Sequence, residues 1–340
     1  MSTADAQLMM TLAALAYIDE TPLQGESLAE QESRILADLN GNATYGLPQS
    51  PAAAGWTAAW VGLSADPQRS NMAYVATSSS ARNTYAVAIR GSDFHLFLDA
   101  LEDFDIRETV TFGPGGTIAT GANDGFHLVT EAVGAAPGPL AGTAMVQALQ
   151  RLVAGAGEGQ PITIYVTGHS LGGALASVVA LYLRSLEWSS SVVFQVYTFA
   201  APTAGDAAFA TAFDKAFPGT APGTDSSWRV FNAFDVVPHA WESLSTVKSF
   251  YPTPPGPVAT LAVKLLLDGI EAYAGGNQYV QPNPAGSPGA LQLNGDYDVH
   301  DPANTAPTFG AFMGQLGFQH GCNTYLQLLG APQVTFQPGT

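Results

Sequence analysis

The chain has 340 residues, of which 46% are apolar and only 11% are charged, and its formal net charge is −17. This composition excludes a disordered chain and allows a large core, while the negative charge makes nucleic acids and anionic membrane surfaces poor partners. Because Cys322 is the only cysteine, no internal disulfide can form.

The first residues show no recognisable targeting signal. Residues 1–20 lack the positive flank and cleavage pattern of a signal peptide. No apolar run is long enough to span a bilayer, so we expect no stable membrane insertion. The chain is expected to be soluble, and its compartment stays open between the cytoplasm and export after trimming.

Apolar periodicity predicts the elements of the first third of the chain. Helical spacing indicates a helix over 5–19 and a second over 28–39. Two β-rich runs at 71–77 and 84–90, joined by a Ser-rich turn, predict a hairpin. Directly after an Arg-Gly-Ser turn, residues 93–105 are typical of an amphipathic helix. Its apolar face consists of Phe94, Phe97, Leu98, Leu101 and Phe104.

Strand and helix continue to alternate further along. Residues 113–125 are expected to form a Gly-rich loop, 258–273 an amphipathic helix and 309–329 a closing helical segment. The other expected elements are helices over 126–134, 140–154 and 206–216 and strands over 192–199 and 228–234. Because no linker separates two cores, the alternation predicts one α/β domain over 1–340 with a mostly parallel sheet.

The chemistry centres on residues 163–174. A β-branched run leads into Gly168-His169-Ser170-Leu171-Gly172, and helix formers follow. This order predicts a strand, a tight turn and a helix with Ser170 at the apex, which is the G-x-S-x-G nucleophile elbow. Glycine is needed at 168 and 172 because a Cβ there would collide with the strand and the helix. The helix N-terminus favours developing negative charge beside the serine.

A serine hydroxyl needs a base within hydrogen-bond reach and an acid that orients the base. On such a scaffold both follow the serine, the acid first. Asp235 comes at the end of a predicted strand and is the best candidate acid, although it is also compatible with a surface turn. Weaker candidates lie in a polar loop, namely Asp296, Asp298 and Asp301.

Six histidines compete for the role of base. We favour His320, which precedes an apolar helix, over His300, which lies in an acidic turn. The others are disfavoured because they precede the serine, adjoin it or lie too close to the acid: His95 and His127, His169, and His239. Cys322 is expected to be a small buried residue beside His320.

A tetrahedral intermediate also needs hydrogen-bond donors. One is the backbone N–H of Leu171, and the other is expected from the loop after an earlier strand, at Ser92. Ser92 is also compatible with a helix N-cap. The chain has no dinucleotide, P-loop, H-E-x-x-H or C-x-x-C spacing, so we expect neither a cofactor nor a metal.

Taken together, these residues resemble the class 3 lipases, the fungal-type triacylglycerol lipases and their bacterial relatives. The agreement covers four stretches in order: 89–92, 168–174, 198–206 and 231–238. Thr203 and Asp206 depart from the family, in which arginine and asparagine are common at these places. The chain also differs by an N-terminal helical extension of about residues 1–70 and an inserted, cap-like stretch of about 241–300, which leaves the histidine less certain.

The resemblance implies an α/β-hydrolase fold, a mostly parallel central sheet with helices on both faces, and ester hydrolysis without a cofactor. It assigns Ser170, Asp235 and His320 to the triad and Ser92 and Leu171 to the oxyanion hole. It also implies that 93–105 is a lid, for which a fixed surface helix and a lid at 258–273 are the alternatives.

We therefore predict a serine ester hydrolase, a triacylglycerol lipase that meets its lipid or other ester substrate at a lipid–water interface. Within the same class, an esterase or a phospholipase would use the same triad. From a different class, a binding protein with the hydrolase fold and no turnover is the alternative. The sequence carries no indication of oligomeric state, acyl-chain length or natural substrate.

Overall fold

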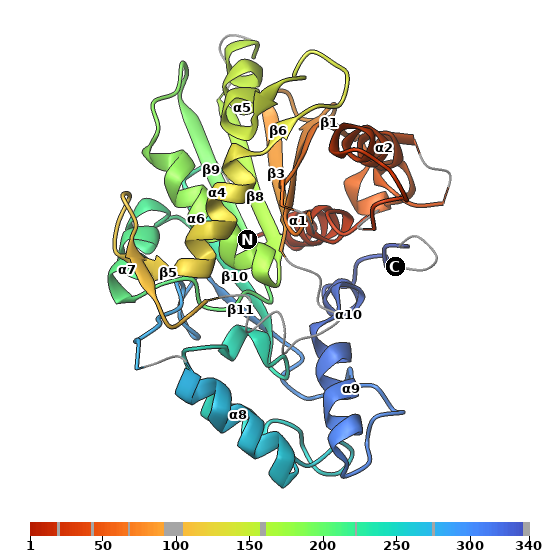
Figure 1. Ribbon diagram of the computed structural model, residues 1–340, viewed down its shortest axis with the longest axis vertical. Coiled ribbons are helices and arrows are strands. Elements are labelled where there is room, and N and C mark those ends of the chain that lie inside the picture. The colour runs from red at the N-terminus through yellow and green to blue at the C-terminus, as the bar shows by residue number, and fades with distance from the viewer. Residues whose placement is uncertain are drawn as a thin grey trace.

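One twisted sheet organises the computed structural model (Figure 1). The structure describes residues 1–18, 21–41, 44–66, 69–91, 105–156, 161–221, 223–273 and 276–335. Within these ranges the main sheet has seven strands in the order β1-β2-β3-β8-β9-β10-β11. They are β1 (Trp56–Leu63), β2 (Met72–Ser78), β3 (Thr84–Arg90), β8 (Ile162–His169), β9 (Val192–Phe199), β10 (Ser226–Asn232) and β11 (Ala290–Leu293).

The sheet is antiparallel at one edge and parallel over the rest. β1, β2 and β3 pair antiparallel, as the predicted hairpin requires, whereas β3, β8, β9, β10 and β11 run parallel to one another. The mostly parallel sheet predicted from the sequence is therefore confirmed. Because parallel strands end at a common edge, the loops after β3, β8 and β10 meet there, where α/β sheets bind their ligands.

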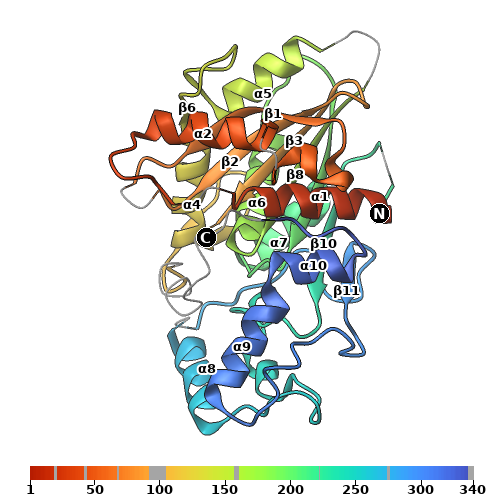
Figure 2. The same cartoon turned by 90° about the vertical axis from the view of Figure 1, so that its right-hand side faces the viewer.

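The two faces of the sheet supply two cores, because successive side chains of a strand point to opposite faces. In β3, Val87 and Ile89 pack into one core and Ala86 and Ala88 into the other. The first core lies under α4 (Thr120–Glu131), α5 (Met145–Ala154), α6 (Leu171–Ser185) and α7 (Ala207–Ala216). The second lies under α1 (Thr3–Leu15), α2 (Leu28–Gly41) and α10 (Cys322–Leu328) (Figures 1 and 2).

The N-terminal extension is part of the packed structure. Helix α1 begins after Ser2, whose hydroxyl accepts the N–H of Asp5 at 3.0 Å and so caps the first turn. Its apolar side chains are buried against the second core. Thr167 of β8 also donates a hydrogen bond to the carbonyl of Met9 at 3.1 Å. The extension therefore contacts the strand that leads to Ser170.

The stretch between the predicted acid and base forms helices outside the sheet and one further strand of the sheet. Helices α8 (Leu261–Tyr273) and α9 (Phe309–His320) lie beyond the carboxyl ends of the parallel strands (Figure 1). β11 instead pairs in parallel with β10 and extends the sheet. On α8, Leu261 and Leu265 are 74% and 61% exposed. Among the described residues, no helix has the length and apolar character needed to cross a bilayer.

Several predicted boundaries were wrong. The expected loop over 113–125 contains β5 (Thr117–Ala119), which pairs with β4 (Thr109–Thr111), and the start of α4. The prediction missed β1, in which Ala58, Ala59 and Gly62 interrupt the strand-forming residues and which pairs with β2. The remaining short elements are β6 (Val133–Gly134), β7 (Thr143–Ala144), η1 (Leu47–Gln49), η2 (Pro51–Ala53), η4 (Val237–His239) and η5 (Leu244–Ser249).

Candidate active site

Ser170 occupies the sharp turn between β8 and α6. Its backbone has φ +58° and ψ −132°, a strained conformation that few non-glycine residues adopt. The N–H of Ser170 donates to the carbonyl of Phe199 at 2.9 Å, which holds the turn on the neighbouring strand. A Cβ on Gly168 would collide with the backbone of Gly172, and one on Gly172 with the carbonyl of Ile89. The two glycines are therefore required by close packing.

The structure brings Ser170, His320 and Asp235 into one hydrogen-bonded chain. His320 Nε2 lies 2.8 Å from Ser170 Oγ, and His320 Nδ1 lies 2.8 Å from Asp235 Oδ2 and 3.1 Å from Oδ1. A carboxylate can only accept, so Nδ1 carries the proton and Nε2 is free to accept the proton of Ser170. This tautomer is the one that a general base for the serine requires.

All three side chains are withdrawn from solvent. Ser170 is 4% exposed, His320 1% and Asp235 0%. The attraction between Asp235 and an imidazolium on His320 is stronger here than in water, because the surroundings screen it less. The arrangement can therefore deprotonate the serine and stabilise the imidazolium that results.

The carboxylate of Asp235 has further donors that fix its orientation. The N–H of Val237 donates to Oδ1 at 3.0 Å, and the phenol of Tyr325 donates to Oδ2 at 2.9 Å. The Tyr325 oxygen itself accepts the N–H of Asn232 at 2.9 Å. Burial and the charge of Asp235 raise the pKa of Tyr325 well above its ordinary value, so the phenol stays a donor.

Buried Arg229 anchors the loop that carries the acid. Its guanidinium donates to the carbonyl of Pro238 at 3.0 Å and lies over the ring of Phe231. Burial lowers the pKa of Arg229. The amide of Gln281 donates to the carbonyl of Ala201 at 2.9 Å, which joins the same region to the turn after β9.

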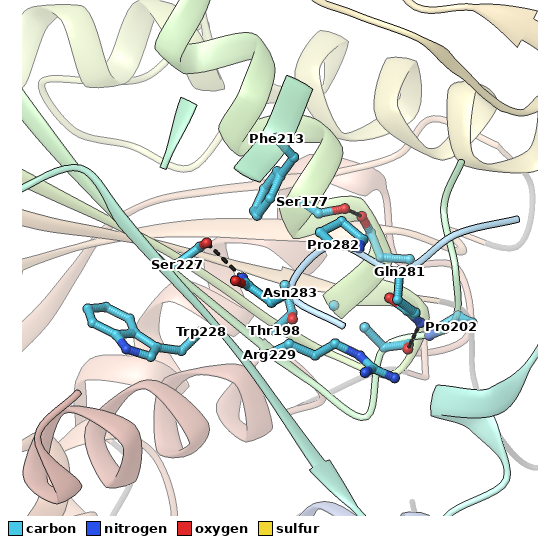
Figure 3. Close-up of a pocket in the computed structure, with 13 residues that line it drawn as sticks. Ser177, Thr198, Pro202, Phe213, Ser227, Trp228, Arg229, Gln281, Pro282 and Asn283 are labelled. Carbon is cyan, nitrogen blue, oxygen red and sulfur yellow. Dashed lines mark hydrogen bonds between the residues drawn. The ribbon is translucent and has the colours of Figure 1, made fainter. Parts of the chain in front are cut away.

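A small cavity lies beside this anchor, between α6, β9, β10 and the segment around Pro282 (Figure 3). Its volume of about 10 Å³ suits a single water molecule rather than an acyl chain. Asn283 donates to Ser227 across one side of it at 2.8 Å. The cavity therefore belongs to the support of the acid loop and is too small for a substrate.

His320 ends α9 and is held from the end of β10. Asn232 Nδ2 donates to the carbonyl of Gln319 at 2.9 Å, and Gln319 Nε2 donates to the carbonyl of Val299 at 2.8 Å. His300, the competing candidate, lies apart from this chain. Its Nδ1 is 3.1 Å from the carbonyl of Tyr297, and its ring stacks on the same tyrosine.

Of the two predicted oxyanion donors, only Leu171 lies within the described residues. The N–H of Leu171 stands in the first turn of α6, directly after Ser170. A Cβ on Gly91 would collide with Leu171 and with the backbone N of Gly172, so the loop after β3 packs against this helix end. Residues 92–104, with Ser92 and the predicted lid side chains, lie outside the described residues. Their roles therefore stay predictions.

Sequence reasoning missed the supporting residues Tyr325, Asn232 and Arg229. Only Arg229 left a signal, as the one charged residue of β10. Tyr325 and Asn232 act across the fold and carry no local motif. Among the residues that the structure describes, no group of three or more His, Cys, Asp or Glu side chains could hold a metal ion.

Comparison with known proteins agrees with this geometry. Residues 86–243 match the family model described as Lipase (class 3). Lipase ZK262.3 of Caenorhabditis elegans is 39% identical over 92 residues, which is 27% of this chain. The match spans only 23% of the worm protein's length.

One solved structure extends the likeness to the fold. The crystal structure of M37 lipase, 24% identical, superposes with a TM-score of 0.77 over 96% of this chain and 93% of its own. Lipase II from Rhizopus niveus, 17% identical, gives a TM-score of 0.47 over 70% of this chain and 76% of its own. Over residues 86–243 the chain is therefore similar to the class 3 lipases, and its fold is the α/β-hydrolase fold.

Proposed function

We propose that this protein is a carboxylic ester hydrolase, a triacylglycerol lipase that acts through an acyl-enzyme on Ser170. The single observation that carries the proposal is the 2.8 Å separation of Ser170 Oγ and His320 Nε2, with Asp235 on the other ring nitrogen. No member of the triad is missing, which argues against a binding protein without turnover.

In the first half of the reaction Ser170 Oγ attacks the ester carbonyl while His320 Nε2 takes its proton. The negative oxygen of the tetrahedral intermediate accepts the N–H groups of Leu171 and Ser92, each of which contributes about 3 to 4 kcal/mol in the transition state. Asp235 stabilises the imidazolium. His320 then donates the proton to the leaving alcohol, and the acyl group stays on Ser170.

In the second half water attacks the acyl-enzyme. His320 takes a proton from the water and returns it to Ser170 as the carboxylic acid leaves. The polar groups needed for both halves are those of the chain itself. The reaction as written therefore requires no cofactor.

The nature of the substrate is tested by acyl-chain length. We expect hydrolysis of p-nitrophenyl esters to continue to long acyl chains and to rise sharply when an emulsion interface forms. This behaviour would support a lipase with a mobile cover, for which 93–105 and α8 are the candidates. A preference for the shortest acyl groups with no response to the interface would indicate an esterase.

The roles in the triad are tested by substitution. Ser170→Ala should lower kcat on the order of a millionfold, as the loss of the nucleophile does in a serine hydrolase. His320→Ala should be comparably inactive, whereas His300→Ala should retain most activity. Wild-type turnover by Ser170→Ala, or loss of activity in His300→Ala but not in His320→Ala, would overturn the assignment.

A further inference from the structure

A second hydrogen bond joins the nucleophile turn to the base, and it involves none of the reacting atoms. Nε2 of His169 lies 2.8 Å from the backbone carbonyl of His320. A carbonyl oxygen only accepts, so Nε2 of His169 carries a proton and donates. The two imidazole rings are 4.7 Å apart between centroids, and both residues are buried.

The two ends of this bond come from distant parts of the fold. His169 ends β8 in the central sheet, whereas His320 ends α9, which arrives from the stretch beyond the sheet. Ser170 follows His169 directly, so a bond from residue 169 to residue 320 also fixes the distance between the nucleophile and the base. A misplacement of about 1 Å in such a pair costs on the order of 100-fold in rate.

We propose that His169 is a positioning residue for ester hydrolysis, which holds the His320 backbone at its working distance from Ser170. The inference rests on the proposed function and names a residue that acts through His320 rather than on the substrate. It explains why a polar side chain is buried at a position that packing alone would fill with an apolar one.

The His169 imidazole, which donates this hydrogen bond, stays neutral during the reaction. Within the described part of the chain, the titratable rings that lie against His169 are those of His320, Tyr17 and Tyr325. Burial, followed by the charge of His320, lowers the pKa of His169 well below its ordinary value. When His320 becomes an imidazolium, the neighbouring ring therefore adds no second positive charge to oppose it.

The N-terminal extension also contacts His169. Tyr17 donates from its phenol to the carbonyl of His169 at 2.9 Å, and the edge of its ring meets the imidazole at 6.1 Å between centroids. The extension thus makes a direct contact with a residue of the site. Loss of the Tyr17 hydrogen bond is expected to weaken the positioning of His169 without touching the triad.

The test compares His169→Phe with His169→Gln in the full chain. Phenylalanine keeps a ring between His320 and Tyr325 but removes the donor, whereas the glutamine amide can restore an N–H near the position of Nε2. Active sites are counted by the p-nitrophenolate burst with a p-nitrophenyl phosphonate. We expect kcat per active site to fall about 10- to 100-fold in His169→Phe, with KM changed less than about twofold, and to recover at least about fivefold in His169→Gln.

The acid limb of the kcat/KM profile, which reports the free enzyme's base, should be the same in His169→Gln and wild type, because His169 is already neutral. Wild-type kcat per active site in His169→Phe would overturn the inference, as would a loss confined to the number of active sites. Equal loss in both variants would also contradict it. A wild-type enzyme that neither reacts with the phosphonate nor hydrolyses esters would instead contradict the proposed function.

Tyr17→Phe provides the weaker, second test. It should lower kcat per active site about fivefold, in line with the loss of one neutral hydrogen bond of about 1 kcal/mol. An unchanged kcat per active site would show that the N-terminal extension does not contribute to the positioning of His169.

Discussion

Tyr325 donates its phenol to Oδ2 of Asp235 at 2.9 Å, on the same oxygen that accepts Nδ1–H of His320 at 2.8 Å. The carboxylate is therefore oriented from two sides before any substrate binds. Because both helices that flank Gly321 contribute a side chain to it, the position of Asp235 depends on how the end of the chain packs against β10.

Tyr325→Phe should lower kcat on the order of tenfold, because a hydrogen bond to a charged group contributes about 1.5 to 3 kcal/mol. The substitution also leaves the N–H of Asn232 without its acceptor, so the free energy of unfolding should fall by about 1 to 3 kcal/mol. Steady-state kinetics and urea unfolding measure the two effects. Tyr273→Phe, at a partly exposed tyrosine on α8, is the control and should change neither. Full activity in Tyr325→Phe would show that the second donor is dispensable.

Gly172→Ala should destabilise the fold by at least about 3 kcal/mol, because the new Cβ meets the backbone carbonyl of Ile89 and neither strand nor helix can yield cheaply. Gly269→Ala is the matched control in α8, where nothing lies within 4 Å of the added methyl group. It should raise the free energy of unfolding by about 0.5 to 1 kcal/mol. Thermal and urea unfolding compare the pair, and a Gly172→Ala protein with wild-type stability would refute the packing argument for the elbow.

His239 should make the folded state sensitive to acid. Burial, followed by the charge of Arg229, lowers the pKa of His239 from 6.5 to about 4. Between these two pH values the unfolded chain binds a proton that the folded protein excludes, so stability present above pH 6.5 is lost as the pH falls towards 4.

At about 1.4 kcal/mol for each pKa unit, the loss from this residue between pH 7 and pH 4.5 is about 2 kcal/mol. His239→Gln, which cannot titrate, should remove that part of the pH dependence in urea unfolding. If His239→Gln loses as much stability as wild type over this pH range, His239 is not the acid-sensitive group.

The elbow was accessible to sequence reasoning because its requirements are local. Gly168 and Gly172 stand on either side of Ser170, and the β-branched run and the helix formers around them need no distant contact to be recognised. The same holds for the hairpin of β2 and β3 and for β9, whose apolar runs are long and bounded by turns.

The parts of the fold and the site that the sequence did not predict depend on pairing and packing between distant parts of the chain. β11 is a short run in a Pro- and Gly-rich stretch and becomes a strand only because β10 offers a free edge. The preference for His320 over His300 came from the neighbouring apolar helix and not from any local rule that reports distance to Ser170. The sequence disfavours His169 as the base because it adjoins Ser170, and that local relation does not report its contact with the His320 backbone. The expectation of one domain over 1–340 stays a prediction.

The central claim, that Ser170 is the nucleophile, is tested most directly by mass spectrometry of the protein after reaction with a p-nitrophenyl phosphonate. We predict one equivalent of p-nitrophenolate, one phosphonyl group per chain on the peptide that contains Ser170, and complete loss of ester hydrolysis in step with labelling. A phosphonyl group on another residue, or hydrolysis that continues at the wild-type rate after Ser170 is fully labelled, would contradict the account.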